Sequence, residues 1–414
     1  MHYQPGSSAF HGDVTQFVNI FRKKRKANKL GPKEFVREFP RSHLTNEMVE
    51  QFNVVEDVGT GKGMLSCCKL INEKKYGGHV LLKIPGAEKT RKDFSIDDKM
   101  FSKLHNTEVD AYNFLQKYPD KRVSYPRIYE LEKMDTNVDP IRQGHIIMEY
   151  LSGISHLYCH DYLKPDELVE PVMHLARFHS IGAELSEEER RDVPRDFLSC
   201  WFNKLFTEQN KQFFIGTWEG EMTQWLSSQV AKDTIPELYG LLTSEVFSNL
   251  NDDCQNSGVQ EVLCHGDFSF HNLLYEKLDN GSYKFRAIID FQSVNWGNAA
   301  QDLSRLFVTA MNGKDRRDSE ERLLRVYYDE LAKVSKGNVP PFTWEQLTHS
   351  YTKFFQLHAA IVCSVTPKLF LNALEGKKEG AEKDEFRNGM MEKQPRRVYG
   401  GTYPPPTWQL PFHE

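Results

Sequence analysis

Long hydrophobic runs are missing from this sequence. None of its apolar stretches approaches the about 18 residues that a membrane-spanning helix needs. The first residues, MHYQPGSSAFHGDV, also lack the apolar core of a secretory signal. We therefore expect a soluble, cytoplasmic protein that does not insert into a membrane.

Disulfide patterns and an excess of positive charge are missing as well. The chain has seven cysteines, an odd number, of which Cys67 and Cys68 are adjacent and none form a C-x-x-C motif. This scatter argues against disulfides and structural zinc and favours a reducing compartment. The formal net charge is −5, so we expect no nucleic-acid partner.

What the sequence does contain is enough apolar material for two lobes in its 414 residues. Strand patterns concentrate in residues 51–151 and helical patterns in residues 152–375, which predicts an α+β chain. Residues 1–50 form a polar N-terminal extension whose basic run receives no function. Residues 376–414 are rich in charge, glycine and proline, and we expect a flexible tail.

Three glycines alternate in the turn between the first two predicted strands. Gly59, Gly61 and Gly63 have no Cβ, so their backbone amides can approach a phosphate closely. An ordinary turn is the alternative interpretation. The segment is not a Walker sequence, because Gly63 rather than serine or threonine follows Lys62.

A lysine lies inside the apolar strand predicted for residues 79–85. Lys83 is costly to bury without an anionic partner, and both a phosphate and a carboxylate would serve. Glu108 and Asp110 lie in a helical pattern about 25 residues further on, and we favour Glu108 as the carboxylate that directs the lysine toward phosphates. A lysine at a strand edge, reaching solvent, is the alternative.

A second apolar strand, residues 145–151, runs into a short polar connector. Such a segment is typical of a kinase hinge, where the backbone at Glu149 and Leu151 would bind adenine. Many strands end in the same way, so the pattern alone does not decide.

Aromatic residues recur at helical spacing between residues 197 and 250. A helical core is the default interpretation. The block also precedes the loop described next, so some of its rings are candidates to line a pocket for an apolar alcohol. In the helix predicted for residues 168–181, we interpret His174 and His179 as ordinary helix residues and not as metal ligands.

The most informative pattern is His265-x-Asp267-x-x-x-x-Asn272, followed by Asp290-Phe291 at the end of an apolar strand. Asp267 is placed to orient or deprotonate an attacking hydroxyl. Asn272 and Asp290 offer hard oxygen ligands to magnesium. Together they are what phosphoryl transfer from ATP requires.

Two further residues are expected to support this loop. His265 more plausibly packs and hydrogen-bonds the loop than takes part in chemistry. Asp302, near the start of a predicted helix, is placed to accept backbone amides of the loop.

The loop, with Asp290-Phe291-Gln292 and Asp302-Leu303, resembles the choline kinase/aminoglycoside phosphotransferase superfamily. It is most similar to the ecdysteroid kinase-like (CHK) group and its uncharacterised nematode branch. The resemblance covers roughly residues 50–375. It implies a protein-kinase-like fold with a small β-rich N-lobe, residues 51–151, and a large helical C-lobe, residues 152–375, with ATP and Mg²⁺ as cofactors.

Two positions depart from protein kinases. Gly266 and Gln292 stand where protein kinases carry arginine and glycine, and no Ala-Pro-Glu follows. Without that arginine, an activation-loop phosphate has no partner. The Asn-Asp and Asp-Phe-Glu segments of choline kinases are absent too, so choline is not the implied acceptor.

The resemblance therefore implies an ATP- and Mg²⁺-dependent phosphotransferase acting on a hydroxyl of a small, lipophilic, steroid- or xenobiotic-like alcohol. Asp267, Asn272 and Asp290 form its expected catalytic set. The alternatives are a nucleotide-binding pseudokinase that acts as an adaptor and, less favoured, a protein kinase.

Overall fold

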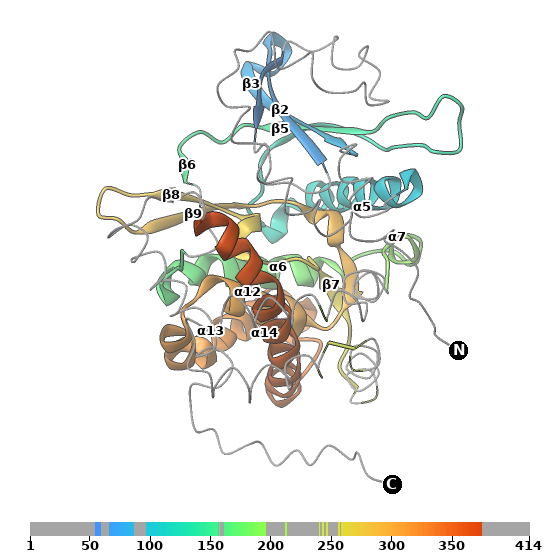
Figure 1. Cartoon of the computed structure of the whole chain (residues 1–414). Helices are drawn as coiled ribbons and strands as arrows, with labels where there is room; N and C mark the ends of the chain where they lie inside the picture. Colours follow the sequence, from blue (N-terminus) through green and yellow to red (C-terminus); the bar gives the residue numbers. More distant parts are fainter. Residues whose placement is uncertain are drawn as a thin grey trace, which may run out of the picture. The chain divides into compact units, whose positions relative to one another are not determined.

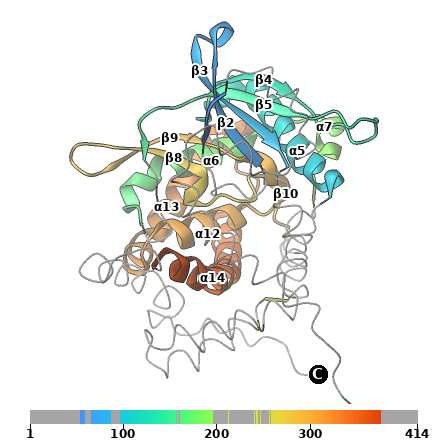
Figure 2. The same ribbon diagram turned by 45° about the horizontal axis from the view of Figure 1, so that its top comes forward.

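The structure is a computed structural model, shown in Figures 1 and 2, and it describes residues 54–58, 66–86, 97–155, 157, 161–195 and 258–374, with a few isolated positions between 212 and 256. The glycine turn, the aromatic block, the N-terminal extension and the C-terminal tail lie outside these residues. The described chain forms two compact units: one runs to Asn113 and includes Pro126–Ser152, and the other combines Phe114–Tyr125 with the chain from Gly153 onward.

The first unit is built on a five-stranded antiparallel sheet in the order β1-β2-β3-β5-β4 (Figure 1). Its elements are β1 Val54–Val58, β2 Ser66–Glu73, η1 Lys74–Tyr76, β3 Gly78–Pro85, α5 Asp98–Lys117 (which continues into the second unit), β4 Ile128–Glu132 and β5 His145–Glu149. The helix α5 starts where the Asp97 carboxylate accepts the amide of Met100, at 2.9 Å.

One face of this sheet carries an apolar cluster. Val80, Leu82 and Ile84 alternate along β3 and pack with Ile71 and Ile147 from the neighbouring strands. Because successive side chains of a strand point to opposite faces, Lys83 projects from the other face. The period-2 pattern of β3 therefore places the lysine on the face opposite this cluster.

The second unit is mainly helical, with two small antiparallel sheets, β10-β7 and β6-β8-β9. Its elements are η2 Pro119–Lys121, β6 Ile154–Ser155, η3 Pro165–Leu168, α6 Val169–Ile181, α7 Glu187–Asp192, β7 Val262–Cys264, η5 Phe270–Asn272, β8 Leu273–Lys277, β9 Tyr283–Ile288, η6 Phe291–Ser293, β10 Asn295–Gly297, α12 Ala299–Ala310, α13 Gly313–Val334, η7 Lys336–Asn338 and α14 Trp344–Leu374. None of the helices in the described ranges is both long and apolar enough to cross a membrane.

Close packing around β7 positions the loop that follows it. The helix α6 contacts β7, and a Cβ at Gly182, just after α6, would come within 3.0 Å of both the Leu263 amide nitrogen and the Trp296 ring. The helices α12 and α14 lie side by side in both views (Figures 1 and 2). Asn298 caps α12 by accepting the amide of Ala300, at 2.9 Å. These contacts hold α6 and α12 against the strand that leads into the polar loop.

The observed architecture is the expected α+β, protein-kinase-like one. An antiparallel sheet with one long helix forms the first unit, and a largely helical second unit carries the polar loop between β7 and β8.

Candidate active site

The predicted lysine–glutamate pair is present in the first unit. The ammonium nitrogen of Lys83 lies 2.7 and 2.6 Å from the two carboxylate oxygens of Glu108, and both residues are buried. Glu108 comes from the middle of α5, one turn after the buried Leu104. Asp110, the other candidate, forms an ion pair with Lys133 instead. A buried pair of this kind leaves neither charge uncompensated, and it holds the lysine in one orientation.

The hinge candidates lie at the end of β5. The amide of Glu149 donates to the carbonyl of Arg127, at 2.8 Å, and the Glu149 carboxylate accepts the amide of Arg127, at 3.2 Å. That amide of Glu149 is therefore used inside the sheet. Leu151 follows in the connector after β5. The phosphate-binding candidates Gly59, Gly61 and Gly63 lie outside the described residues.

In the second unit, the polar loop begins with a glycine that no other residue can replace without rearrangement. Gly266 has a φ of +81°, and a Cβ on it would lie 2.0 Å from the carbonyl oxygen of Ser293. Both features require glycine. This explains in physical terms why an arginine is missing here: the backbone of the loop lies directly against the segment that follows Asp290.

Asp302 holds the start of the loop, as predicted. Its Oδ2 accepts the amide of His265 at 2.6 Å, and its Oδ1 accepts the amide of Gly266 at 2.9 Å. Burial on its own raises the pKa of the Asp302 carboxyl, but the hydrogen bonds from His179 and from the amide of His265 outweigh it and hold that pKa below its usual value. The carboxylate is therefore charged when it binds the loop.

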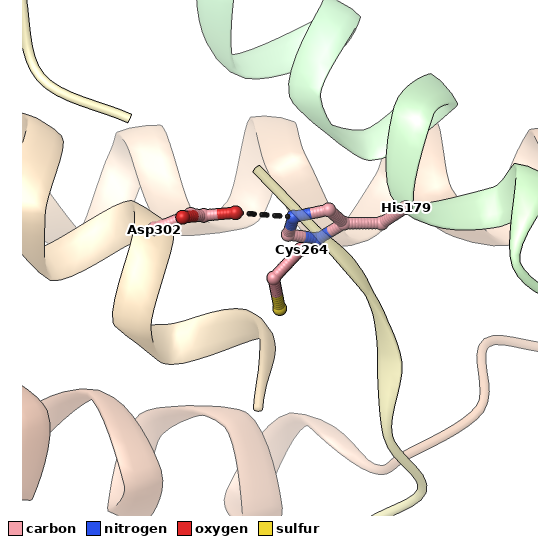
Figure 3. Close-up of side chains that lie close together, drawn as sticks. All are labelled: His179, Cys264 and Asp302. Carbon is pink, nitrogen blue, oxygen red and sulfur yellow. Dashed lines mark hydrogen bonds and ion pairs between the residues drawn. The ribbon is translucent and has the colours of Figure 1, made fainter. Parts of the chain in front are cut away.

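His179 supports Asp302 from behind, and the sequence interpretation of an ordinary helix residue missed this role. Its Nε2 lies 3.1 Å from Asp302 Oδ2 (Figure 3). Its Nδ1 lies 2.7 Å from the Tyr327 hydroxyl. Because the ionised Asp302 carboxylate can only accept, Nε2 of His179 carries the proton that points to it. This contact makes His179 a positioning residue for the loop.

The same two residues and Cys264 form a compact buried group, with their ligand atoms within 4.8 Å of one another (Figure 3). The group does not fit a metal site. The oxygens of Asp302 accept two backbone amides, and both ring nitrogens of His179 have partners. Burial and the charge of Asp302 also raise the pKa of the Cys264 thiol well above its usual value, whereas a thiol must lose its proton to bind a metal.

Asn272 and Asp290 are brought together by the backbone. The amide of Ile289 donates to the carbonyl of Asn272, at 3.0 Å, which extends the pairing of β8 with β9 by one step. His265 Nδ1 accepts the amide of Asp267, at 3.4 Å, as expected for a residue that hydrogen-bonds the loop, and its Nε2 lies 3.1 Å from the carbonyl of Ile289. Asp290 has a φ of +67°, a left-handed conformation that is uncommon outside glycine and concentrates at functional sites.

The donor set at this point fits a hard cation such as Mg²⁺. Asn272 donates its side-chain Nδ2 to the Asp267 carbonyl, at 2.8 Å, and to Asp267 Oδ2, at 3.2 Å. Its side-chain oxygen is therefore the atom that it can offer to a metal. Asp290, the residue after Ile289, offers a carboxylate, of which Oδ2 accepts a hydrogen bond from Gln292 at 3.3 Å. Amide and carboxylate oxygens are the ligands that magnesium uses.

Asp267 is also contacted by a residue that the sequence interpretation did not select. Arg305 places its Nε and Nη2 at 3.0 and 2.7 Å from Asp267 Oδ1. A signal for it existed, because Arg305 follows Asp302 by three residues in α12, and residues at this spacing share one helix face. Since Asp302 was predicted to face the loop, Arg305 was predictable as a second contact.

The comparisons with known proteins identify the family of this chain. Residues 45–396 match the DUF1679 family, whose description is "Uncharacterized oxidoreductase dhs-27". The chain belongs to this family. The match, together with the nematode relatives, one of them kinase-like, confirms the family resemblance expected from the sequence.

Two relatives come from Caenorhabditis elegans. "Uncharacterized oxidoreductase dhs-27" is 26% identical over 61% of this chain and 30% of its own length. "Uncharacterized kinase-like protein D1044.1" is 31% identical over 31% of this chain and 34% of its own length. The chain thus matches about a third of the length of each. Among solved structures, choline kinase from Cryptosporidium parvum Iowa II is 14% identical, with a TM-score of 0.45 over 92% of this chain and 93% of that one.

Proposed function

We propose that this protein is an ATP- and Mg²⁺-dependent kinase that transfers the γ-phosphate of ATP to a hydroxyl of a small, lipophilic, steroid- or xenobiotic-like alcohol. The observation that carries the proposal is the arrangement of Asp267, Asn272 and Asp290, which hydrogen bonds to the neighbouring backbone bring into one small region. Phosphoryl transfer needs little covalent chemistry from a protein, so positioning and electrostatics of this kind are its main requirements.

Each of the side chains has its own role in the proposed reaction. Lys83, held by Glu108, offers a cation of fixed orientation to the phosphates. Asp267 orients the acceptor hydroxyl and takes up its proton, while Asn272 and Asp290 hold the metal through their side-chain oxygens. When bound, the metal supplies positive charge that neutralises the phosphates during transfer.

The lipophilic nature of the acceptor rests on the family resemblance and on the aromatic residues 197–250, which lie outside the described residues. The use of ATP, the use of magnesium and the alcohol acceptor are parts of one proposal, and one assay tests them together.

A dehydrogenase function, suggested by the description of the family and of one relative, fits this chain less well. A dinucleotide-binding domain of the Rossmann type is built on a mostly parallel sheet. In the part of the chain that the structure describes, every strand pairing is antiparallel. The relative that carries the oxidoreductase name matches this chain over 30% of its length.

A pseudokinase adaptor is the second candidate, and one observation favours it. Both carboxylate oxygens of Asp267 already accept hydrogen bonds, Oδ1 from Arg305 and Oδ2 from Asn272. ATP binding without turnover across a broad set of acceptors would support this reading. Transfer to generic protein substrates, and to no small alcohol, would instead support a protein kinase.

The deciding experiment is incubation of the protein with ATP, Mg²⁺ and a mixed metabolite extract, with mass spectrometry to detect products heavier by one phosphate. We expect such products from the unchanged protein. Asp267→Asn should lower kcat by about 10²–10⁴-fold, the usual contribution of acid–base groups, and Asp290→Ala should abolish turnover. Asp279→Ala, at an exposed position after β8, is the matched control and should leave turnover unchanged. Full activity in a folded Asp290→Ala protein would exclude the assignment.

A further inference from the structure

A permanent positive charge lies against the carboxylate that the acceptor hydroxyl has to reach. The guanidinium of Arg305 donates from Nε and Nη2 to Asp267 Oδ1, at 3.0 and 2.7 Å. The side chains of Arg305 and Asp267 are 27% and 35% exposed. The pair is therefore accessible to a bound molecule while still partly shielded from water.

The backbone of α12 fixes the position of this charge. Arg305 follows Asp302 by three residues, and Asp302 is bound to the loop amides of His265 and Gly266. The hydroxyl of Thr309 donates to the carbonyl of Arg305, at 2.8 Å, within the same helix. Arg305 thus keeps its place relative to Asp267 because one helix anchors both the loop and the arginine.

The other titratable groups packed around α12 leave the charge of Arg305 in place. Asp302 is engaged by the loop amides and by His179. His358, from α14, is buried and has a pKa lowered to about 3, first by burial and then by the charge of Arg305, so it stays neutral near pH 7. Around the reacting hydroxyl, the negative charge of Asp267 is therefore balanced by Arg305 rather than left to attract a cation.

We infer that Arg305 determines the charge class of the acceptor: it favours alcohols that are neutral or anionic near the reacting hydroxyl and excludes amino alcohols and quaternary ammonium alcohols. This inference rests on the proposed function. A cationic group two carbons from the hydroxyl would lie about 6–8 Å from the guanidinium once the hydroxyl reaches Asp267. At an effective dielectric constant of about 20, repulsion over this distance corresponds to roughly 10- to 100-fold in affinity, which offsets the attraction of the same cation to Asp267 and leaves the cost of removing that cation from water uncompensated.

The test uses pairs of alcohols that differ only in charge. Choline and 3,3-dimethylbutan-1-ol have the same shape, with a trimethylammonium group in one and a tert-butyl group in the other, and longer lipophilic pairs extend the set. Each compound is measured both as an acceptor and as a competitor of phosphorylation in the metabolite extract. We expect the neutral member to act at least tenfold better with the unchanged protein.

Three variants separate charge from structure. Arg305→Met should reduce the preference for the neutral member to within about threefold, and Arg305→Lys, which keeps the charge, should retain most of it. A purely structural role would lower activity toward both members equally and leave their ratio unchanged. Arg322→Met, at an exposed ion pair of α13 with Asp166, is the matched control and should leave the ratio unchanged.

The outcomes are distinct. Equal use of both members by the unchanged protein, an unaltered ratio in Arg305→Met, or products of the extract that derive mainly from cationic alcohols would overturn the inference while the kinase function stands. If the extract yields no phosphorylated product at all, the proposed function itself fails and the inference falls with it.

Discussion

At the scale of single residues, the missing Cβ atom of Gly266 determines how closely the polar loop can approach the chain after Asp290. Its φ of +81° and the 2.0 Å distance from a hypothetical Cβ to the Ser293 carbonyl oxygen exclude any side chain at this position in the present backbone. Glycine therefore allows the loop to contact the chain after Asp290 closely, and it leaves no room for the arginine that protein kinases carry at this position. The identity of this residue was visible in the sequence, but the neighbour that it touches was not.

Gly266→Ala should destabilise the protein by about 2–4 kcal/mol, because a left-handed backbone and a steric overlap both oppose the added methyl group. It should also lower turnover, since Asp267 is the next residue. Gly281→Ala is a well-matched control: Gly281 has the same φ of +81°, but a Cβ on it would meet nothing within 4 Å. Chemical denaturation of both variants measures the difference, and equal losses would show that the contact with Ser293 has no energetic effect.

Single residues also mark where sequence reasoning succeeded and where it stopped. The pairing of Lys83 with Glu108 and the binding of loop amides by Asp302 were predictable, because a buried charge needs a partner and a carboxylate near a helix start suits amides. The role of His179 was not predictable, since its partners Asp302 and Tyr327 are 123 and 148 residues away in the chain. Periodicity shows that a residue is buried but not what it contacts.

At the scale of elements, α12 carries two functions on one face. Asp302 binds the loop and Arg305 contacts Asp267, three residues apart. The helix α12 also packs against α14. In this contact His358 of α14 is buried, and its Nδ1 lies 2.8 Å from the hydroxyl of Ser304 in α12. The packing of these two helices should therefore depend on His358 remaining uncharged.

Acid should weaken this packing. Burial and the charge of Arg305 lower the pKa of His358 to about 3 in the folded protein, below the ordinary value of about 6.5. Because the folded pKa is the lower one, the stability contribution is complete above about pH 6.5 and is lost as pH falls toward 3. At pH 5 the loss is on the order of 2 kcal/mol.

Urea denaturation of the unchanged protein and of His358→Gln, at pH 7.5 and pH 5, measures this effect. The variant should show a smaller loss between the two pH values, but not none, because burial also lowers the pKa values of His105 and His174 to about 4. An identical pH dependence in both proteins would mean that His358 does not titrate across the unfolding transition.

The sequence predicted most of these elements, since strands β3 and β5 and helices α6 and α13 have clear apolar periods. It did not predict the short strand pairing of β7 with β10, because three-residue strands carry too few positions for a period to appear.

At the scale of the whole molecule, each unit holds groups of one kind. The first carries the buried ion pair of Lys83 and Glu108, and the second carries Asp267, Asn272 and Asp290, the side chains proposed to activate the hydroxyl and to bind the metal. If a single reaction uses both, changes in the first unit should affect the affinity for ATP, and changes in the second should affect transfer.

A double variant tests the first unit without leaving a buried charge unpaired. Lys83→Met alone would leave the Glu108 carboxylate buried without a partner, which is strongly destabilising. Lys83→Met combined with Glu108→Leu removes both charges and should preserve folding. The double variant should bind ATP about 10- to 100-fold more weakly, the usual effect of losing a charged hydrogen bond. Calorimetric titration with ATP and thermal denaturation provide the two measurements. Unchanged ATP affinity in a folded double variant would show that the pair is purely structural.

The contact between Gly266 and Ser293 has a consequence for how such a site can diverge. A change on one side of this contact requires a matching change on the other, because the two backbones leave no room between them. The backbone positions of Asp267, next to Gly266, and of Asp290, three residues before Ser293, therefore cannot shift independently of each other. New acceptors must be accommodated through residues outside this contact, and Arg305, which touches Asp267 by its side chain alone, is such a residue.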